Sequence, residues 1–292
     1  MSTGTDRQLD RRVSVSGLCF PSLTAVESIE VVASLGVSAM SMSRYKLLDA
    51  DLALVAEAGR RHGVRIVATT AALAFDLSSR ASVRDGIAQA CADVDRAAAV
   101  GARSVYGVLG PRPSADWSLA AAAFAEVAAE VVEYAGRRGV TVGIEPASSL
   151  YADVTFLHSF RDAIGIARAA GLVVCLDLFH VWIEGSLHDD IRQHADLIGH
   201  VQVADLVGGD RALPAQSVPG EGIIPLREMI GWLIEAGYDG VFDVELGGPR
   251  IEAAGQVEAA SRAARWVDQT LASARPAARH GLRLVDSPEP PP

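Results

Sequence analysis

A three-part phrase recurs through this chain: an alanine-rich amphipathic stretch, then a glycine, then a short run rich in β-branched residues. The glycines are Gly36, Gly63, Gly101, Gly139, Gly171 and Gly237, and the runs after them are 37–40, 64–67, 102–105, 140–142, 172–175 and 241–244. A glycine directly after a helix readily takes the left-handed conformation that closes the last helical turn. The phrase therefore predicts helices that are each followed by a buried strand, the order typical of a parallel sheet.

Two further apolar runs, at 13–18 and 198–203, bring the strands to about eight, the number that closes a (β/α)8 TIM barrel. The 292 residues, 50% of them hydrophobic, suit one such α/β domain. An open doubly wound sheet is the competing fold, but Cys19-Phe20-Pro21-Ser22 stands where its glycine-rich phosphate turn would follow the first strand. We predict a single-domain barrel over 13–272, with flexible tails at 1–12 and at 273–292, the latter rich in proline.

Charge and cysteine content limit the classes of partner. A formal net charge of -10 repels phosphate backbones, so no nucleic-acid partner is expected. No run is apolar and long enough for a membrane span, and the first dozen residues lack the apolar core of a secretory signal. Cys19, Cys91 and Cys175 form no CxxC pair. We therefore expect reduced cysteines in a cytoplasmic protein that does not enter a membrane.

Polar side chains lie at the ends of the last four predicted strands. In a parallel barrel, catalytic and binding residues are found at these strand ends. They are Glu145, Asp177, Gln202 and Glu245. A single carboxylate at a strand end commonly faces solvent or caps the next helix, but three that converge repel one another unless a cation or protons neutralise them. Three carboxylates and an amide oxygen form a hard, anionic ligand set that favours Mn²⁺ or Mg²⁺. The pattern predicts a divalent-metal site.

Five phrases carry a family resemblance: GIEP (143–146), CLDLFH (175–180), GHVQVAD (199–205), VPGEGIIPL (218–226) and GYDGVFDVEL (237–246). In this order they resemble the xylose isomerase-like TIM barrels, which include sugar phosphate isomerases and epimerases, ketose 3-epimerases, hydroxypyruvate isomerase and inosose dehydratase. The resemblance implies metal ligands at Glu145, Asp177, Gln202 and Glu245, with His180 facing the substrate. Many relatives carry histidine where Gln202 stands, so Co²⁺ and Zn²⁺ remain alternatives to Mn²⁺ and Mg²⁺.

The alternation of side-chain direction along a strand indicates two further candidate site residues, both expected to be buried. Because alternate strand residues face the same side, His200 points inward below Gln202, and Asp243 does so below Glu245. His200 is therefore either a buried hydrogen-bond partner behind the ligands, for instance of Asp243, or a rival metal ligand. We favour the partner role because Gln202 lies nearer the rim.

Loop residues supply the candidate substrate contacts. Arg211 could reach an anionic or enediolate oxygen or lie in solvent, and Glu221 could close the rim of the pocket or belong to a simple turn. Trp182 could shape a sugar-sized pocket or pack in the core. Phe179 and Arg250 are further candidates for contacts of this kind.

These residues predict acid–base chemistry on a small polyhydroxy carbonyl compound. In an isomerase or epimerase, the metal would polarise the carbonyl, one of Glu145 and Glu245 would remove the neighbouring C–H proton, and the other would return it to the enediolate. A lyase of the inosose dehydratase type would share the first step and then expel a leaving group. A sugar-binding barrel without turnover is a third possibility. An AP endonuclease would need a histidine-rich multi-zinc site and a basic groove, which this charge and ligand set do not provide.

The expected partner is a sugar-like small molecule. It is expected to be unphosphorylated, because no lysine-rich phosphate clamp is evident. A homodimer and a homotetramer are both left open.

Overall fold

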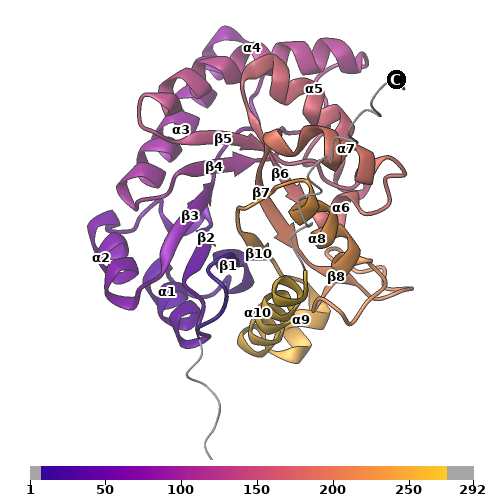
Figure 1. Cartoon of the computed structure of the whole chain (residues 1–292). Helices are drawn as coiled ribbons and strands as arrows, with labels where there is room; N and C mark the ends of the chain where they lie inside the picture. The colour runs from indigo at the N-terminus through magenta and orange to yellow at the C-terminus, as the bar shows by residue number, and fades with distance from the viewer. Residues whose placement is uncertain (1–7, 275–292) are drawn as a thin grey trace, which may run out of the picture.

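The structure is a computed structural model that describes residues 8–274 (Figure 1). Eight parallel strands close into a barrel in the order β1-β10-β7-β6-β5-β4-β3-β2. Their bounds are β1 Val13–Ser16, β2 Ala39–Met42, β3 Arg65–Thr70, β4 Ser104–Gly107, β5 Thr141–Ile144, β6 Val173–Asp177, β7 Ile198–Val203 and β10 Phe242–Val244. Each overlaps a run expected from the sequence, so the predicted (β/α)8 TIM barrel is confirmed.

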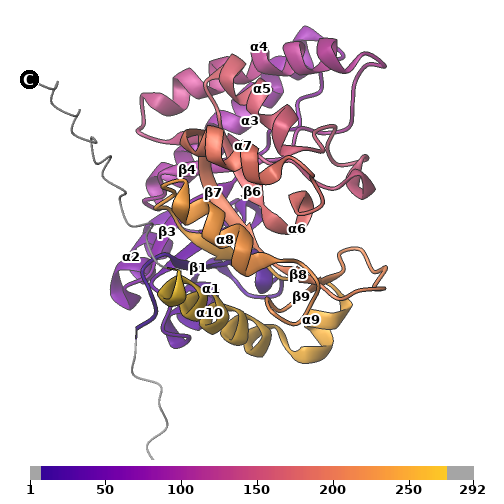
Figure 2. The same cartoon turned by 45° about the vertical axis from the view of Figure 1, so that its right-hand side comes forward.

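Helices surround the barrel and connect its strands (Figures 1 and 2). They are α1 Ala25–Ser34, α2 Leu52–His62, α3 Arg80–Ala99, α4 Trp117–Gly136, α5 Phe160–Ala170, α6 Leu178–Val181, α7 Leu187–His194, α8 Leu226–Glu235, α9 Pro249–Ala254 and α10 Gln256–Ser273, with 3-10 turns η1 Gly17–Cys19, η2 Arg44–Lys46, η3 Ser149–Tyr151 and η4 Ala195–Leu197. The six glycines of the recurring phrase all have positive φ, between 66° and 91°. This backbone conformation explains why glycine stands at each of these junctions.

Side-chain caps determine where most of the outer helices begin. The side chains of Thr24, Asp51, Ser79, Asp116 and Ser159 accept hydrogen bonds from backbone N–H groups in the first turns of α1 to α5. Each cap of this kind stabilises a helix by about 1 kcal/mol. Because the caps end the βα loops, they also set the length of the loops that surround the carboxyl ends of the strands.

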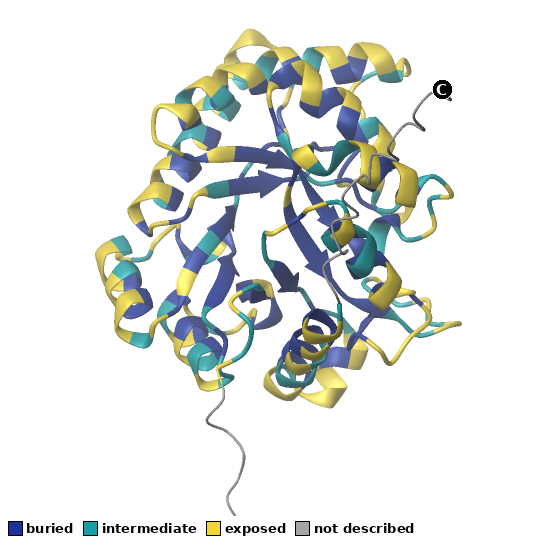
Figure 3. Cartoon of the chain, in the orientation of Figure 1, coloured by how far each residue is buried: buried dark blue, intermediate teal, exposed yellow. Residues whose placement is uncertain are grey.

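Buried residues follow the strands and the inner faces of the helices (Figure 3). The main apolar core lies between these two layers, while Ala68, Tyr106 and Cys175 form a separate small cluster. The strands also carry buried polar side chains, which are uncommon in a core and need partners there. They include Ser14, Ser41, His200, Gln202 and Asp243. The centre of the barrel is therefore a polar layer that can support a site above it.

The ends of the domain differ in detail from the predicted tails. Residues 8–12 contact the barrel, because Leu9 N donates to Gly36 O at 3.1 Å and Asp10 N donates to Asp268 Oδ1 at 2.7 Å. Helix α10 continues to Ser273, one residue into the predicted C-terminal tail. The rest of both predicted tails lies outside the described residues.

A short antiparallel hairpin follows β7 where the sequence suggests only a loop. Its strands are β8 Asp205–Leu206 and β9 Gln216–Ser217, and it lies beside α9 (Figure 2). Cys19, Cys91 and Cys175 are free thiols. Within residues 8–274, no helix has the length and apolar character that a membrane crossing requires.

Candidate active site

The four predicted ligands come from four neighbouring strands. Glu145 follows β5, Asp177 ends β6, Gln202 lies in β7 and Glu245 follows β10. Asp177 and Gln202 are aligned across the β6–β7 pair. Because parallel strands bring their carboxyl ends to the same edge, the structure gathers these residues at one mouth of the barrel.

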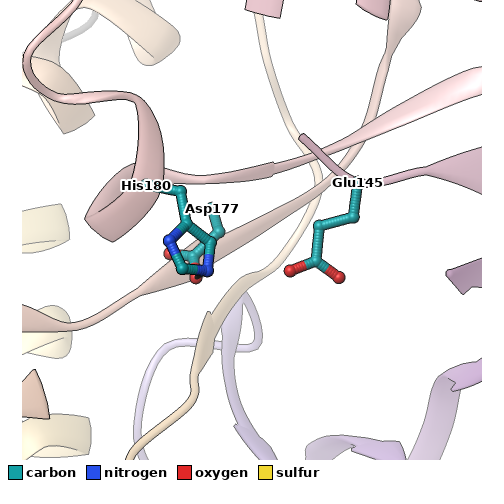
Figure 4. A group of neighbouring side chains, drawn as sticks. All are labelled: Glu145, Asp177 and His180. Carbon is teal, nitrogen blue, oxygen red and sulfur yellow. Dashed lines mark ion pairs between the residues drawn. The ribbon is translucent and has the colours of Figure 1, made fainter. Parts of the chain in front are cut away.

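Glu145, Asp177 and His180 form the tightest group at this mouth. One nitrogen or oxygen atom from each lies within 4.8 Å of the other two, and Figure 4 shows the Glu145 carboxylate extending toward the other pair. Asp177 Oδ1 accepts a hydrogen bond from Phe179 N at 2.9 Å, while Oδ2 lies 3.6 Å from His180 Nε2. Because Asp177 caps α6 in this way, the first turn of that helix carries His180 back over the carboxylate. His180 Nδ1 is buried, and no group within residues 8–274 forms a hydrogen bond with it.

Gln202 and Glu245 form a second pair beside this group. Gln202 Nε2 donates to Glu245 Oε2 and, at 3.3 Å, to Tyr106 Oη. On its other side, Gln202 Oε1 accepts a hydrogen bond from Cys175 Sγ at 3.0 Å. The amide is fully buried, whereas Glu145 and Glu245 remain partly exposed at the mouth.

Burial and mutual repulsion make these carboxylates hard to ionise together. Burial, together with the negative charge of Asp177, raises the pKa of Glu145 to about 8. Burial is also the main reason why the pKa of Glu245 is well above its usual value, and Glu145 and Asp177 add to that shift. The pKa of Asp177 is raised by burial despite the opposing effect of His180. Across residues 8–274, no lysine or arginine forms an ion pair with any of the three.

These donors fit a divalent cation. Glu145 and Asp177 lie in one group with His180, Glu245 lies outside this group, and the charges of Glu145 and Asp177 add to the raised pKa of Glu245. Carboxyl groups that are costly to ionise without positive charge suit Mg²⁺ or Mn²⁺. A ring nitrogen of His180 adds a donor type that Zn²⁺ and Co²⁺ also accept. Gln202 presents Nε2 rather than Oε1 to Glu245, so its amide would have to turn over before its oxygen could bind a cation.

His200 and Asp243 contact each other below the four predicted ligands. This contact was suggested by the alternation of side-chain direction along the strands. His200 Nε2 lies 3.3 Å from Asp243 Oδ2, and Asp243 also accepts hydrogen bonds from Ser14 and Ser41. The His200 ring stacks on Tyr106, with ring centroids 5.2 Å apart. His200 thus faces Asp243 and Tyr106. It does not belong to the group formed by Glu145, Asp177 and His180.

The loop arginine and glutamate proposed as substrate contacts lie elsewhere. Arg211 is exposed on the β8–β9 hairpin, where its guanidinium donates to Asp210 O. Glu221 pairs with Arg262 of α10 at 2.6 Å on the surface. In the described part of the chain, neither contacts the carboxylates, and Arg250 also pairs with Asp210 rather than with them.

Asp205 explains why Glu221 turns outward. Its carboxylate accepts hydrogen bonds from the backbone N–H groups of Leu206, Gly220, Gly222 and Ile224. The segment therefore wraps closely around Asp205, and a Cβ at position 222 would lie only 2.2 Å from Asp205 Oδ1. This path leaves the Glu221 side chain facing Arg262.

Aromatic residues surround His180 on one side of the mouth. The rings of Phe179 and Tyr151 each meet His180 edge to face, with centroids 5.2 Å away. Trp182 is partly buried and packs against the main core. Tyr151 was missed in the sequence because nothing in its loop marks it. Tyr106 was also missed, although the alternation of side-chain direction along the fourth strand could have indicated that its side chain faces the inside of the barrel.

Comparisons with known proteins agree with this architecture. The family model of the xylose isomerase-like TIM barrel matches residues 29–270. A putative hydroxypyruvate isomerase of Streptomyces coelicolor is 32% identical over 124 residues, 41% of each chain. The fructoselysine 3-epimerase of Escherichia coli O157:H7 is 27% identical over 127 residues, 42% of this chain and 44% of the epimerase. The matches thus span less than half the length of these curated relatives.

A solved structure of the IOLI protein with a binding zinc atom has a TM-score of 0.79 and 19% identity. The match covers 90% of this chain and 99% of that protein, and at this identity it shows a common fold. The family match over residues 29–270 includes seven of the eight barrel strands, β2 to β7 and β10. The chain belongs to the xylose isomerase-like TIM barrel family.

Proposed function

We propose that the protein is a divalent-metal-dependent isomerase or epimerase of a keto-sugar or a related small polyhydroxy carbonyl compound. The observation that carries this proposal is the pair formed by Glu145 and Glu245. Their carboxyl groups come from nonadjacent strands, both have raised pKa values, and both remain partly exposed at the mouth. A carboxyl group with a pKa raised into the neutral range can both accept and return a proton at that pH.

The cation would be held by Glu145, Asp177, Gln202 and Glu245. When bound, it would polarise the carbonyl of the substrate and so acidify the neighbouring C–H bond. One of the two glutamates takes the proton of that bond, so that the C–H bonding pair forms a carbon–carbon double bond and the carbonyl π pair moves onto oxygen to give an enediolate. In an epimerase, the other glutamate then returns a proton to the same carbon on the opposite face. In an isomerase, it returns a proton to the former carbonyl carbon, and the hydroxyl proton moves to the former carbonyl oxygen as the new carbonyl forms. His180 offers its unpartnered ring nitrogen to a substrate oxygen during these steps.

The relatives support this class of chemistry. A hydroxypyruvate isomerase and a 3-epimerase both catalyse rearrangements that move a proton beside a carbonyl, and the zinc-bearing IOLI structure supports a divalent cation. Among cations, the oxygen-rich ligand set supports Mn²⁺ or Mg²⁺ first, with Co²⁺ and Zn²⁺ as alternatives. The cytoplasmic location and a homodimeric or homotetrameric assembly stay predictions from the sequence.

A solvent-exchange experiment tests the proposal directly. Protein loaded with Mn²⁺ is incubated in D₂O with hydroxypyruvate, a series of keto-sugars and inososes, and NMR follows deuterium entering C–H positions. We expect exchange with at least one of them, and none with protein treated with EDTA. Exchange accompanied by loss of water would identify the lyase alternative. If no compound exchanges with the loaded protein, the proposed proton transfer is wrong.

A further inference from the structure

The side-chain amide of Gln202 is held by three groups of different hydrogen-bonding character. Its Nε2 faces Glu245 and Tyr106, and its Oε1 faces Cys175. Gln202, Tyr106 and Cys175 are all at most 1% exposed, so water does not compete for these contacts. Every polar atom of the amide is therefore satisfied by protein groups alone.

Two of these three partners can serve either end of the amide. A phenol and a thiol can each donate or accept a hydrogen bond, and at neutral pH both ordinarily carry their protons. Glu245 Oε2 accepts a hydrogen bond from Nε2 in the structure. If the amide turned over, Tyr106 Oη would donate to Oε1 and the Cys175 sulfur would accept from Nε2. Only Glu245 distinguishes the two orientations.

We propose that Tyr106 is a positioning residue that holds Gln202 in two orientations, and that the amide turns over when the cation binds. In the orientation that the structure describes, Nε2 bonds Glu245. With a cation bound, Oε1 would face the cation and accept from the Tyr106 phenol. This inference rests on the proposed cation site and goes beyond it, because it assigns a role to a residue outside the ligand set.

Tyr106 is well fixed for this role. It reaches Gln202 across the barrel, since β4 and β7 are not neighbours in the sheet. Its ring stacks on His200 with an interplanar angle of 19°, and His200 is in turn held by Asp243. A phenol oxygen kept in place by this stack can exchange donor and acceptor roles through rotation of its O–H bond alone.

The two orientations depend unequally on the phenol. In the orientation that the structure describes, Nε2 already has Glu245 as an acceptor, so loss of the Tyr106 hydroxyl removes only a second bond of 3.3 Å. In the loaded state the same loss removes the donor that holds Oε1 toward the cation. Tyr106→Phe should therefore weaken cation binding, by about threefold to tenfold for one neutral hydrogen bond.

The first test measures Mn²⁺ affinity by electron paramagnetic resonance, without any substrate. Tyr106→Phe should raise the dissociation constant, while the matched control Tyr238→Phe should leave it unchanged. Tyr238 is also a buried tyrosine, but its hydroxyl donates to Val241 O rather than to the amide. Unchanged affinity in Tyr106→Phe would overturn the inference. Absence of Mn²⁺ binding by the unmodified protein would instead refute the proposed site itself.

A second test separates positioning from general support of the barrel. In a Gln202→Met background, which keeps the length but removes the amide, Tyr106→Phe should no longer change Mn²⁺ affinity. A full effect in that background would mean that Tyr106 does not act through Gln202.

The unmodified protein offers a third measurement that does not depend on folding of variants. NMR with Mg²⁺ should show new nuclear Overhauser contacts from the Gln202 Nε2 protons to the Cys175 Hβ protons. Contacts that stay the same with and without saturating Mg²⁺ would show that the amide does not turn over.

Discussion

His200 Nε2 lies 3.3 Å from Asp243 Oδ2, and both side chains are almost wholly buried where β7 and β10 run side by side. Asp243 also accepts hydrogen bonds from Ser14 and Ser41, which extends the network across β1 and β2. A buried carboxylate is costly unless its oxygens are hydrogen-bonded, and three strands, β1, β2 and β7, supply those partners here. The network therefore ties together the part of the barrel where the sheet closes.

Removal of the Asp243 carboxylate should destabilise the protein strongly. We expect Asp243→Ala to lower the free energy of unfolding by about 3 kcal/mol, because it leaves two hydroxyls and an imidazole without their acceptor. Asp243→Asn keeps one acceptor oxygen and should cost about 1 kcal/mol. Urea titrations would measure both, with Asp239→Asn as the control. Equal stability of Asp243→Ala and the unmodified protein would contradict the structural role of this network.

The fold and the grouping of Glu145 with Asp177 were predictable because they depend on local patterns. Glycines at six helix–strand junctions, apolar runs and polar residues at strand ends all occur in short stretches, and Glu145 and Asp177 lie together because parallel strands align their ends. The Tyr106 contact was not predictable from such patterns, since it joins strands that are not neighbours. The outward turn of Glu221 was missed because it depends on backbone N–H groups bound by Asp205, which carry no signal in residue type.

Stability of the cation-free protein should depend on pH through Glu145. The pKa of this group is about 8 in the folded state against 4.5 when unperturbed, so its contribution is fully present below pH 4.5 and lost as the pH rises through 8. In EDTA, the free energy of unfolding should fall across this window, by up to about 1.4 kcal/mol per pH unit for one proton. Saturating Mn²⁺ should reduce this fall.

Denaturant titrations from pH 5 to pH 8.5, with EDTA or with Mn²⁺, would measure the effect. Glu145→Gln should flatten the EDTA profile because it removes the titrating group. A profile that is equally steep in this variant would mean that another group is responsible.

Substitution of Gln202 by histidine should change which cation is preferred. An imidazole nitrogen favours Zn²⁺ or Co²⁺ over Mg²⁺ more than an amide oxygen does. Gln202→His should therefore bind Zn²⁺ more tightly relative to Mg²⁺, by about tenfold or more. Calorimetric titration with each cation would show the shift. An unchanged preference would argue that Gln202 is not a ligand and would make His200 the next candidate.

The effect of removing charge from the metal ligands should be distinguishable from the effect of removing the proton-transfer groups. Asp177→Asn removes charge from the ligand set but leaves Glu145 and Glu245 in place, so it should weaken Mn²⁺ binding, and excess Mn²⁺ should restore much of the activity. Glu145→Gln or Glu245→Gln keeps one oxygen for the cation but cannot accept a proton. Turnover of these two variants should fall by about a hundredfold or more, even at saturating Mn²⁺.

The measurement that decides this is rescue by metal, followed on a substrate found in the D₂O screen. Activity and Mn²⁺ affinity are titrated together in the three variants, so that each rate is taken at known occupancy. In each glutamate variant, C–H exchange with solvent then shows which half of the reaction survives. If exchange is lost at one face of the substrate only, the missing glutamate is the base for that face. If both glutamate variants are fully active once saturated with Mn²⁺, the two-base mechanism is wrong, and His180, which lies in one group with Glu145 and Asp177, becomes the residue to test.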